Sequence, residues 1–280
     1  MCRREKIKPR GLVARSWMDR ETGARRNWDY QDLLSRLFHT SPVQLGWAAD
    51  YTPAEPSAAG KSHLASRAAA LMGGTQGHIK QEILDCCCRS MQYGLNFNTQ
   101  GNISVRVPAS GLIAITPTGL EYDRMAADDI VVVDAEGRRV EGERHPSSET
   151  DVHLVVYRRG PDVNAIVHTE PVYSNVFGVL GRPIEAVLIN MAIYSRAPVP
   201  VMPFMPSNST EFGEAMVKVV GTRNAVIWGN HGLMTVGADL TSAFRCNVTV
   251  ETAARVQHAA LCLGQPHVLS YAELNLAPAP

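Results

Sequence analysis

The sequence lacks the features that define several large classes of protein. None of its six cysteines forms a CxxC pair, and Cys86, Cys87 and Cys88 are consecutive, which suits neither a disulfide framework nor a zinc finger. No apolar run is long enough to span a bilayer, and the basic N-terminus has no apolar core of a secretory signal. The formal net charge is zero, so nothing global points to nucleic acid or to an anionic membrane. We therefore expect a cytoplasmic protein with neither partner, in which the three cysteines fill packing space on a helix.

The first 74 residues differ from the rest. Residues 1–29 carry nine basic and four acidic side chains, and residues 51–70 are rich in Ala, Ser and Pro, a composition typical of linkers. We expect residues 1–74 to form an extension that is disordered or partly helical, with a short helix at 30–38. Alternatively, this stretch is an organellar transit peptide, or translation begins at Met72 and the stretch upstream is not part of the protein. Hydrophobic residues make up 45% of the chain and charged residues 19%, which is typical of a globular protein. Because regular patterns begin at Thr75, we expect the folded domain at 75–275.

From Thr75 onward, apolar residues recur with helical or strand periodicity. Helices are predicted after Thr75 up to Gly94, after Pro146 (where Ser148 and Asp151 have the spacing of a capping box), and at 172–180, 210–220 and 240–263. Strands are predicted at 103–107, 112–116, 130–134, 138–141, 165–168, 225–228 and 233–236. The strands cluster and the helices bracket them. This order favours a three-layer α/β/α sandwich with a mostly antiparallel or mixed central sheet.

Two short motifs carry metal-ligand chemistry. His168 and Glu170 stand two residues apart at the end of a predicted buried strand, so their side chains project to the same side. His231 lies in Gly229-Asn230-His231-Gly232, where glycines permit a tight turn. Two histidines and a carboxylate form a catalytic zinc set, and the same set suits iron or manganese. Each motif alone is a weak signal, because histidines at strand ends are more often structural or solvated than metal-binding.

Three polar segments could hold a phosphate: Gly101–Ser104, Thr116–Gly119 and Pro146–Glu149. The last adds a predicted helix N-terminus, where free N–H groups favour an anion. Glu149 in the first turn of that helix would lie beside the bound phosphosugar and could take or return a proton. Taken singly, each segment is better explained as an ordinary turn or a helix cap than as a phosphate site.

In this order, the five motifs resemble the signature of the class II aldolase/adducin family over about Gly77 to Gly264. The resemblance implies a zinc-dependent α/β/α domain, usually a ring-shaped homotetramer with active sites between subunits. By position it implies a phosphate-binding set of Asn102, Thr118, Gly119, Ser147 and Ser148, the catalytic acid/base Glu149, and the metal ligands His168, Glu170 and His231.

The sequence departs from the family pattern at two places. Glu170 stands where the family usually has a third histidine, which makes the site one charge more negative. Where fuculose-phosphate aldolases place a tyrosine that reaches the neighbouring active site, this chain has Leu188 and Ile189, and Tyr194 is the only tyrosine between Ile184 and Val199.

The resemblance implies a metal-dependent aldolase, closest to the fuculose-phosphate type, that splits a ketose 1-phosphate into dihydroxyacetone phosphate and an aldehyde. The alternatives within the family are a pentulose-phosphate 4-epimerase and a decarboxylase of a phosphorylated oxo-acid. The alternative that is not an enzyme is an adducin-like domain used for binding or assembly.

Overall fold

The computed structural model describes residues 17–18, 25–26, 75–108, 110–196 and 198–276. The chain divides into two units, Met1–Ala65 and Ser66–Pro280. In the first unit, the two-residue strands β1 (Trp17–Met18) and β2 (Arg25–Arg26) pair antiparallel. The helix expected at 30–38 lies outside the described residues. Among the described residues, no helix has both the length and the apolarity that a membrane span requires.

The second unit contains both helices and strands. Its helices are α3 (Thr75–Gln92), α4 (Thr150–Arg159), α5 (Val172–Leu180), α6 (Asn190–Tyr194), α7 (Thr210–Val220) and α8 (Leu240–Leu263). Its strands are β3 (Asn102–Arg106), β4 (Ile113–Ile115), β5 (Val131–Val133), β6 (Arg139–Glu141), β7 (Ala165–Thr169), β8 (Val201–Met202), β9 (Ala225–Trp228) and β10 (Gly232–Gly237). Two 3₁₀ turns, Tyr122–Arg124 and Ala127–Asp129, connect β4 to β5.

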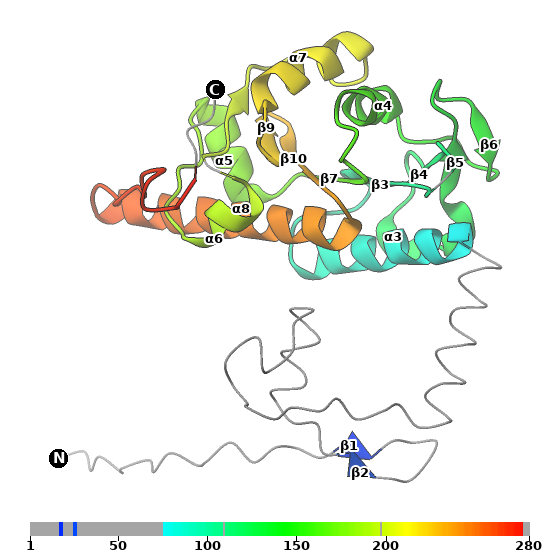
Figure 1. The fold of residues 1–280 in the computed structure, drawn as a ribbon, viewed down its shortest axis with the longest axis horizontal. Coiled ribbons are helices and arrows are strands. Elements are labelled where there is room, and N and C mark those ends of the chain that lie inside the picture. The colour runs from blue at the N-terminus through cyan, green and yellow to red at the C-terminus, as the bar shows by residue number, and fades with distance from the viewer. Residues whose placement is uncertain (1–16, 19–24, 27–74, 109, 197, 277–280) are drawn as a thin grey trace. The chain divides into compact units, whose positions relative to one another are not determined.

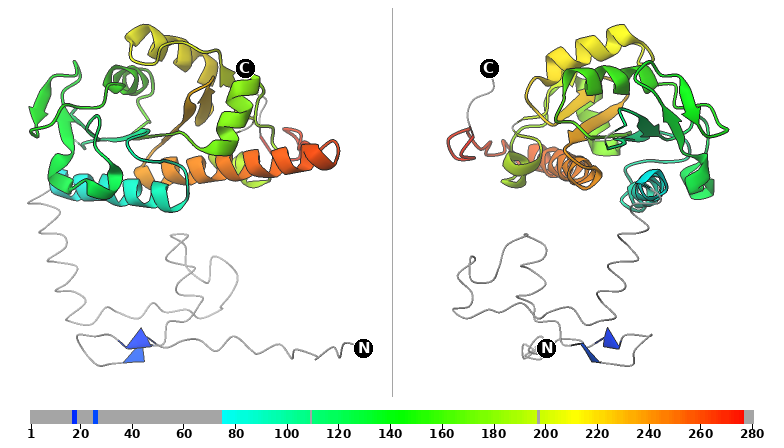
Figure 2. Two further views of the ribbon diagram at one scale, coloured as in Figure 1. Left: turned by 180° about the vertical axis from the view of Figure 1, so that it is seen from behind. Right: turned by 45° about the vertical axis from the view of Figure 1, so that its right-hand side comes forward.

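The strands form one eight-stranded sheet in the order β6-β5-β4-β3-β7-β10-β9-β8. Every neighbouring pair is antiparallel except β8 with β9. Helices α3 and α8 cover one face of the sheet, and α4 and α7 cover the other (Figure 1). A view from behind and a view turned by 45° show the same three layers (Figure 2). The predicted α/β/α sandwich with a mostly antiparallel sheet is confirmed.

The strands distribute their side chains between the two faces with a period of two. In β5, Val132 packs in the core under α3, whereas Val131 and Val133 pack in the core under α4 and α7. In β3, Ile103 and Val105 join the α3 side. The alternate positions of β3 therefore face α4, and this is the face on which the polar residues of the next section gather.

Two expectations about individual elements need correction. Helix α4 begins at Thr150 and not before it, so Glu149 is its N-cap and makes no capping hydrogen bond through its side chain. The capping box predicted from Ser148 is therefore wrong, because the N-cap position belongs to Glu149. The strand β8 and helix α6 were not predicted; they have two and five residues, too few to show a periodic pattern.

Two of the three consecutive cysteines fill packing space as predicted, and the third does not. Cys86 and Cys87 are buried in the core under α3, and Cys88 on the same helix is exposed.

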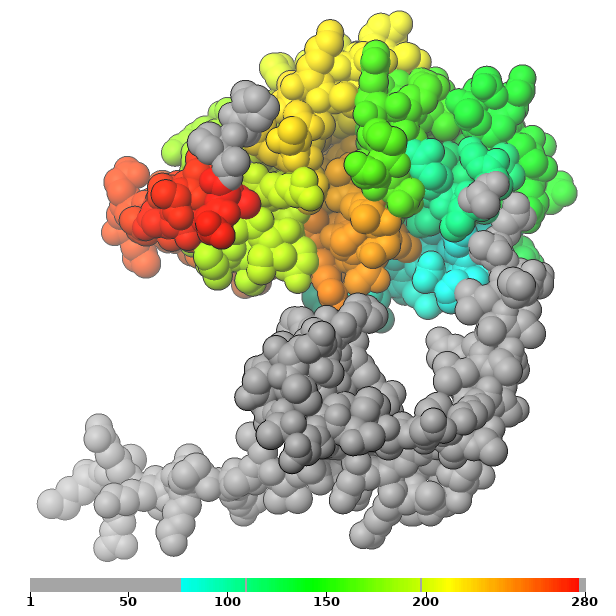
Figure 3. Space-filling view, viewed as in Figure 1, coloured from blue at the N-terminus to red at the C-terminus, as the bar shows by residue number. Residues whose placement is uncertain are grey.

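On the opposite face of the sheet, α4 and α7 lie side by side at the surface, as the adjoining green and yellow areas show (Figure 3). Arg159 and Glu214 join these two helices in an exposed ion pair of 2.8 Å.

Gly101, at the start of β3, provides a test of the fit between β3 and β7. Its φ is +71°, and a Cβ there would lie 2.5 Å from the carbonyl oxygen of His168. We expect Gly101→Ala to lower the free energy of unfolding by about 3 kcal/mol or more, because backbone strain and steric overlap each cost about 1–3 kcal/mol. Urea denaturation measures the change.

Gly94→Ala is the matched control, because Gly94 has a φ of +67° but open space around its Cβ position. It carries the strain without the overlap and should cost about 1–2 kcal/mol. Equal losses in the two variants would contradict the close approach of Gly101 to β7.

Candidate active site

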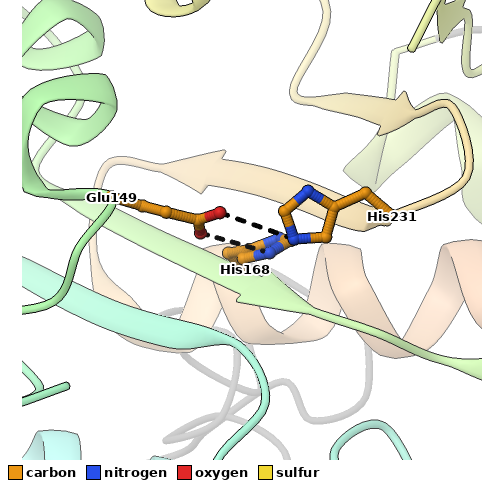
Figure 4. Close-up of side chains that lie close together, drawn as sticks. All are labelled: Glu149, His168 and His231. Atoms are coloured by element: carbon orange, nitrogen blue, oxygen red, sulfur yellow. Dashed lines mark ion pairs between the residues drawn. The ribbon is translucent and has the colours of Figure 1, made fainter. Parts of the chain in front are cut away.

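The register of the sheet brings the first two site residues together. His168 of β7 is paired directly with Asn102 of β3, so the two side chains stand next to each other on one face. Both are buried. Glu149, at the N-terminus of α4, extends over this pair, and its Oε2 lies 3.4 Å from His168 Nε2 (Figure 4).

His231 reaches the same point from the turn between β9 and β10. The N–H of His231 donates to the carbonyl of Trp228, and Asn230 within this turn has a φ of +58°, a left-handed conformation that asparagine tolerates. Gly232 follows; a Cβ there would lie 2.8 Å from His168 Cε1, so the turn can approach β7 only with glycine. His231 Nε2 ends 3.4 Å from Glu149 Oε1 (Figure 4).

The surroundings of His168 fix its protonation. Its Nδ1 lies 3.2 Å from the carbonyl oxygen of Leu233, which can only accept, so Nδ1 carries the proton. Its ring stacks on Trp228 with a centroid distance of 4.1 Å. Burial lowers the pKa of His168 to about 4, so the ring is neutral at pH 7 and its Nε2 carries a lone pair.

Glu149 is held from both sides. Its Oε1 accepts a hydrogen bond of 2.6 Å from the Ser207 hydroxyl, and its Oε2 accepts one of 2.8 Å from Asn102 Nδ2. Burial raises the pKa of Glu149, but the adjacent His168, the hydrogen bonds from Ser207 and Asn102, and His231 together lower it below its ordinary value. Because His168 is neutral at pH 7, the two hydrogen bonds are the contribution that persists there, and they favour an ionised carboxylate.

The ionised Glu149 carboxylate and His168 Nε2 therefore present electron pairs to each other, and His231 Nε2 faces the same carboxylate. Glu149, His168 and His231 each direct one ligand atom to a region in which these atoms lie within 4.8 Å of one another. His168 Nε2 is fully buried and has no hydrogen-bond donor. Ligand atoms about 2.0–2.1 Å from a tetrahedral ion lie about 3.4 Å apart, which is the separation of each imidazole Nε2 from the carboxylate. The donor set and its spacing fit a divalent cation.

Glu170, predicted as the third metal ligand, lies at the edge of this group. Its nearer oxygen is 4.0 Å from His231 Nε2. It follows the last residue of β7 and is half-buried, and burial raises its pKa. Glu149 thus occupies the position closest to both imidazoles, whereas the sequence pattern assigned that place to Glu170. Whether Glu170 binds the cation stays a prediction.

The predicted phosphate segments lie beside each other. Pro117 and Pro146 form an isolated antiparallel bridge, the N–H of Thr118 donates to the carbonyl of His145, and the N–H of Ser147 donates to that of Thr116. Thr118, Gly119 and Ser148 are exposed, whereas Ser147 is buried and accepts the N–H of Glu149 through its hydroxyl. Asn102, the remaining residue of the predicted phosphate-binding set, donates a hydrogen bond from its amide nitrogen to Glu149.

Three residues of the site were not predicted from the sequence: Ser207, Trp228 and His153. Ser207 precedes α7 in a segment that looks like an ordinary helix-capping loop, and nothing local links it to Glu149, which is 58 residues away. His153 had a usable signal, because it lies four residues after Glu149 and therefore on the same side of α4.

Residues 81–258 match the family model described as Class II Aldolase and Adducin N-terminal domain. The chain belongs to the class II aldolase/adducin family. A 5-deoxy-D-ribulose 1-phosphate aldolase of Bacillus thuringiensis serovar kurstaki is 34% identical over 71% of this chain and 93% of its own length. An L-fuculose phosphate aldolase of Escherichia coli (strain K12) is 32% identical over 67% of this chain and 86% of its own.

A solved structure of an L-fuculose 1-phosphate aldolase has the same fold, with a TM-score of 0.68 at 33% identity over 71% of this chain and 93% of that chain. Class II aldolases depend on a divalent metal, which agrees with the donor set formed by Glu149, His168 and His231.

Removing one imidazole tests the cation site. We expect His231→Ala to weaken the affinity of the metal-free protein for Zn²⁺ by more than about 100-fold, because loss of a group that only orients a ligand already costs about 10–100-fold. Competition with a chromogenic chelator measures it. His267→Ala is the control, since its side chain is 75% exposed and far along the sequence from the site. Unchanged affinity in His231→Ala would show that the metal binds elsewhere.

The same assay tests Glu170. If its carboxylate binds the cation, Glu170→Gln should weaken the affinity by about tenfold or more, because a formal charge and a ligand oxygen are lost. An affinity equal to wild type would leave Glu149 as the carboxylate of the site.

Proposed function

We propose that this protein is a divalent-metal-dependent aldolase that cleaves a ketose 1-phosphate to dihydroxyacetone phosphate and an aldehyde. The observation that supports this most strongly is the position of Glu149. Its carboxylate is held by Ser207 and Asn102 and faces the Nε2 atoms of His168 and His231 at 3.4 Å each. A proton-transfer group beside a candidate metal site is what a retro-aldol reaction needs.

The substrate phosphate is proposed to bind along the paired segments 116–119 and 146–149. The exposed residues Thr118, Gly119 and Ser148 offer hydroxyl and backbone N–H groups next to the N-terminus of α4. Ser147 and the second N–H of Asn102 complete the proposed set. An anion held there places the C1 to C3 part of the ketose, with the phosphate on C1, close to Glu149, since Ser148 and Glu149 are adjacent in the chain.

The division of labour follows from the charges. His168 and His231, with the carboxylates of Glu149 and Glu170, would hold a divalent cation, which would supply Lewis-acid stabilisation of negative charge on the substrate oxygens. Glu149 carries the proton to C3 of the dihydroxyacetone phosphate half in cleavage and removes it in condensation. In condensation its lowered pKa keeps it ionised and ready to accept that proton; in cleavage it must first take up the proton that leaves the C4 hydroxyl as the C3–C4 bond breaks. Trp228, stacked on His168, keeps water away from the inner side of the site.

The two curated relatives are named for ketose phosphates, L-fuculose phosphate and 5-deoxy-D-ribulose 1-phosphate. We propose that this chain acts on the same class of compound, and that it does so as a homotetramer with active sites between subunits. Support for an interface comes from exposed apolar side chains on and near α5 and α6: Val179, Leu180, Ile189 and Ile193 are each more than half exposed. Such a concentration is typical of surfaces that bury against a partner.

A panel of ketose 1-phosphates, assayed with added Zn²⁺, Mn²⁺ or Fe²⁺, tests the proposed reaction. Release of dihydroxyacetone phosphate with an aldehyde, from L-fuculose 1-phosphate or 5-deoxy-D-ribulose 1-phosphate, is the expected result. A C4 epimer or carbon dioxide as product would replace the aldolase by an epimerase or a decarboxylase. Absence of any conversion, together with absence of metal binding, would favour a non-catalytic binding domain.

Glu149→Gln tests the proton-transfer step. With enough added Zn²⁺ to keep the metal content near that of wild type, we expect turnover to fall by about two to four powers of ten, the usual scale for loss of a general acid/base. Steady-state cleavage and metal analysis of the purified variant measure the two quantities. Turnover equal to wild type would remove Glu149 from the mechanism.

Glu251→Gln is the matched control. Glu251 is a partly buried carboxylate, but it accepts the N–H groups of Tyr173 and Ser174 at the start of α5. Its replacement should reduce stability while turnover per folded molecule stays within about twofold of wild type, because its oxygens are committed to the helix N-terminus.

A further inference from the structure

A line of buried hydrogen bonds leads away from Glu149 into the layer between the sheet and α4. Asn102 Oδ1 lies 2.6 Å from His153 Nε2, His153 Nδ1 lies 2.7 Å from the Ser104 hydroxyl, and that hydroxyl lies 2.8 Å from the Tyr157 hydroxyl. His153 and Ser104 are completely buried, and Tyr157 is 4% exposed. The line contains no substrate-facing group except Glu149 and Asn102.

The direction of each hydrogen bond follows from the carboxylate. Ionised Glu149 can only accept, so Asn102 directs its amide nitrogen to it, and the amide oxygen of Asn102 must then accept from His153. His153 Nε2 therefore carries the ring proton, and its Nδ1 must accept from Ser104.

The far end of the line agrees with this direction. Because the Ser104 hydroxyl donates its hydrogen bond to His153, its oxygen can accept a hydrogen bond from the Tyr157 hydroxyl. Burial raises the pKa of Tyr157, so its hydroxyl keeps the proton that it donates. Burial likewise lowers the pKa of His153 to about 3, so the ring is neutral at pH 7 and one of its nitrogens is free to accept.

We propose that His153 and Ser104 are positioning residues, which lock the Asn102 amide with its nitrogen toward Glu149 and thereby fix the carboxylate for proton transfer. Without the His153 proton, the Asn102 amide could rotate by 180° and turn its oxygen toward the carboxylate, where two acceptors would repel each other. The inference rests on the proposed role of Glu149 for its kinetic consequence, but the tautomer that it requires is independent of any activity.

The decisive experiment is a long-range ¹H–¹⁵N correlation spectrum of the full chain labelled in histidine, at pH 7. We expect His153 as the neutral Nε2–H tautomer. His168, which donates to Leu233 through Nδ1, should show the opposite tautomer in the same spectrum. His153→Gln assigns the signal by its disappearance. A charged ring, or the Nδ1–H tautomer, at His153 would overturn the proposal.

Ser104→Ala tests the consequence for catalysis. Removal of the hydroxyl deprives Nδ1 of its donor, so we expect a mixture of tautomers at His153 and a fall in kcat of about tenfold, with KM and metal content unchanged. Tyr157→Phe should keep the Nε2–H tautomer, because Ser104 still donates to His153. Ser195→Ala, which removes an equally buried hydroxyl at the end of α6, should leave kcat unchanged.

The outcomes separate the two proposals. If wild type cleaves no ketose phosphate but shows the expected tautomers, the proposed function fails and the orientation of the hydrogen bonds stands. If wild type is active, and Ser104→Ala folds with unchanged kcat, the positioning role of Ser104 and His153 is wrong while the aldolase assignment remains. Should Ser104→Ala not fold, the wild-type spectrum alone decides.

Discussion

The site depends on electron pairs that face one another with no proton between them. His168 uses its only ring proton on the Leu233 carbonyl, and its other nitrogen points at the Glu149 carboxylate from a fully buried position. A buried acceptor without a donor costs about 1–3 kcal/mol, and an adjacent carboxylate adds repulsion. A cation between these atoms converts that cost into attraction, which is why the arrangement indicates a metal site rather than an ordinary ion pair.

The sheet makes this arrangement from segments that are far apart in sequence. Residues 149, 168 and 231 meet because β7 lies between β3 and β10, and because α4 begins directly above the β3–β7 pair. The period of two in the strands decides the face: the same alternation that sends Ile103 under α3 turns Asn102 and Ser104 toward α4. A slip of one residue in β3 would bury the Asn102 amide on the opposite face and break its contact with Glu149.

Much of this could be predicted from the sequence, and the failures have physical reasons. Helices α7 and α8 and strand β9 have the predicted bounds, because each carries a long periodic or continuous apolar pattern. That His168 and His231 lie close together was expected from the family signature. The sequence did not predict that Glu149 lies closer to the imidazoles than Glu170 does, because this depends on where α4 begins above the sheet. Ser207 and the partners of His153 are contacts across 49 or more residues, which local spacing does not encode.

The central claim is that one cation binds simultaneously to His168 and His231. The most direct measurement is anomalous diffraction from crystals grown with Zn²⁺ or Mn²⁺ and recorded at the absorption edge of the metal. The account predicts a single strong peak within bonding distance of both Nε2 atoms, about 2.0–2.2 Å, with a Glu149 or Glu170 oxygen close by. A peak that touches only one of these imidazoles, or a crystal in which the two Nε2 atoms are too far apart to share an ion, would contradict it.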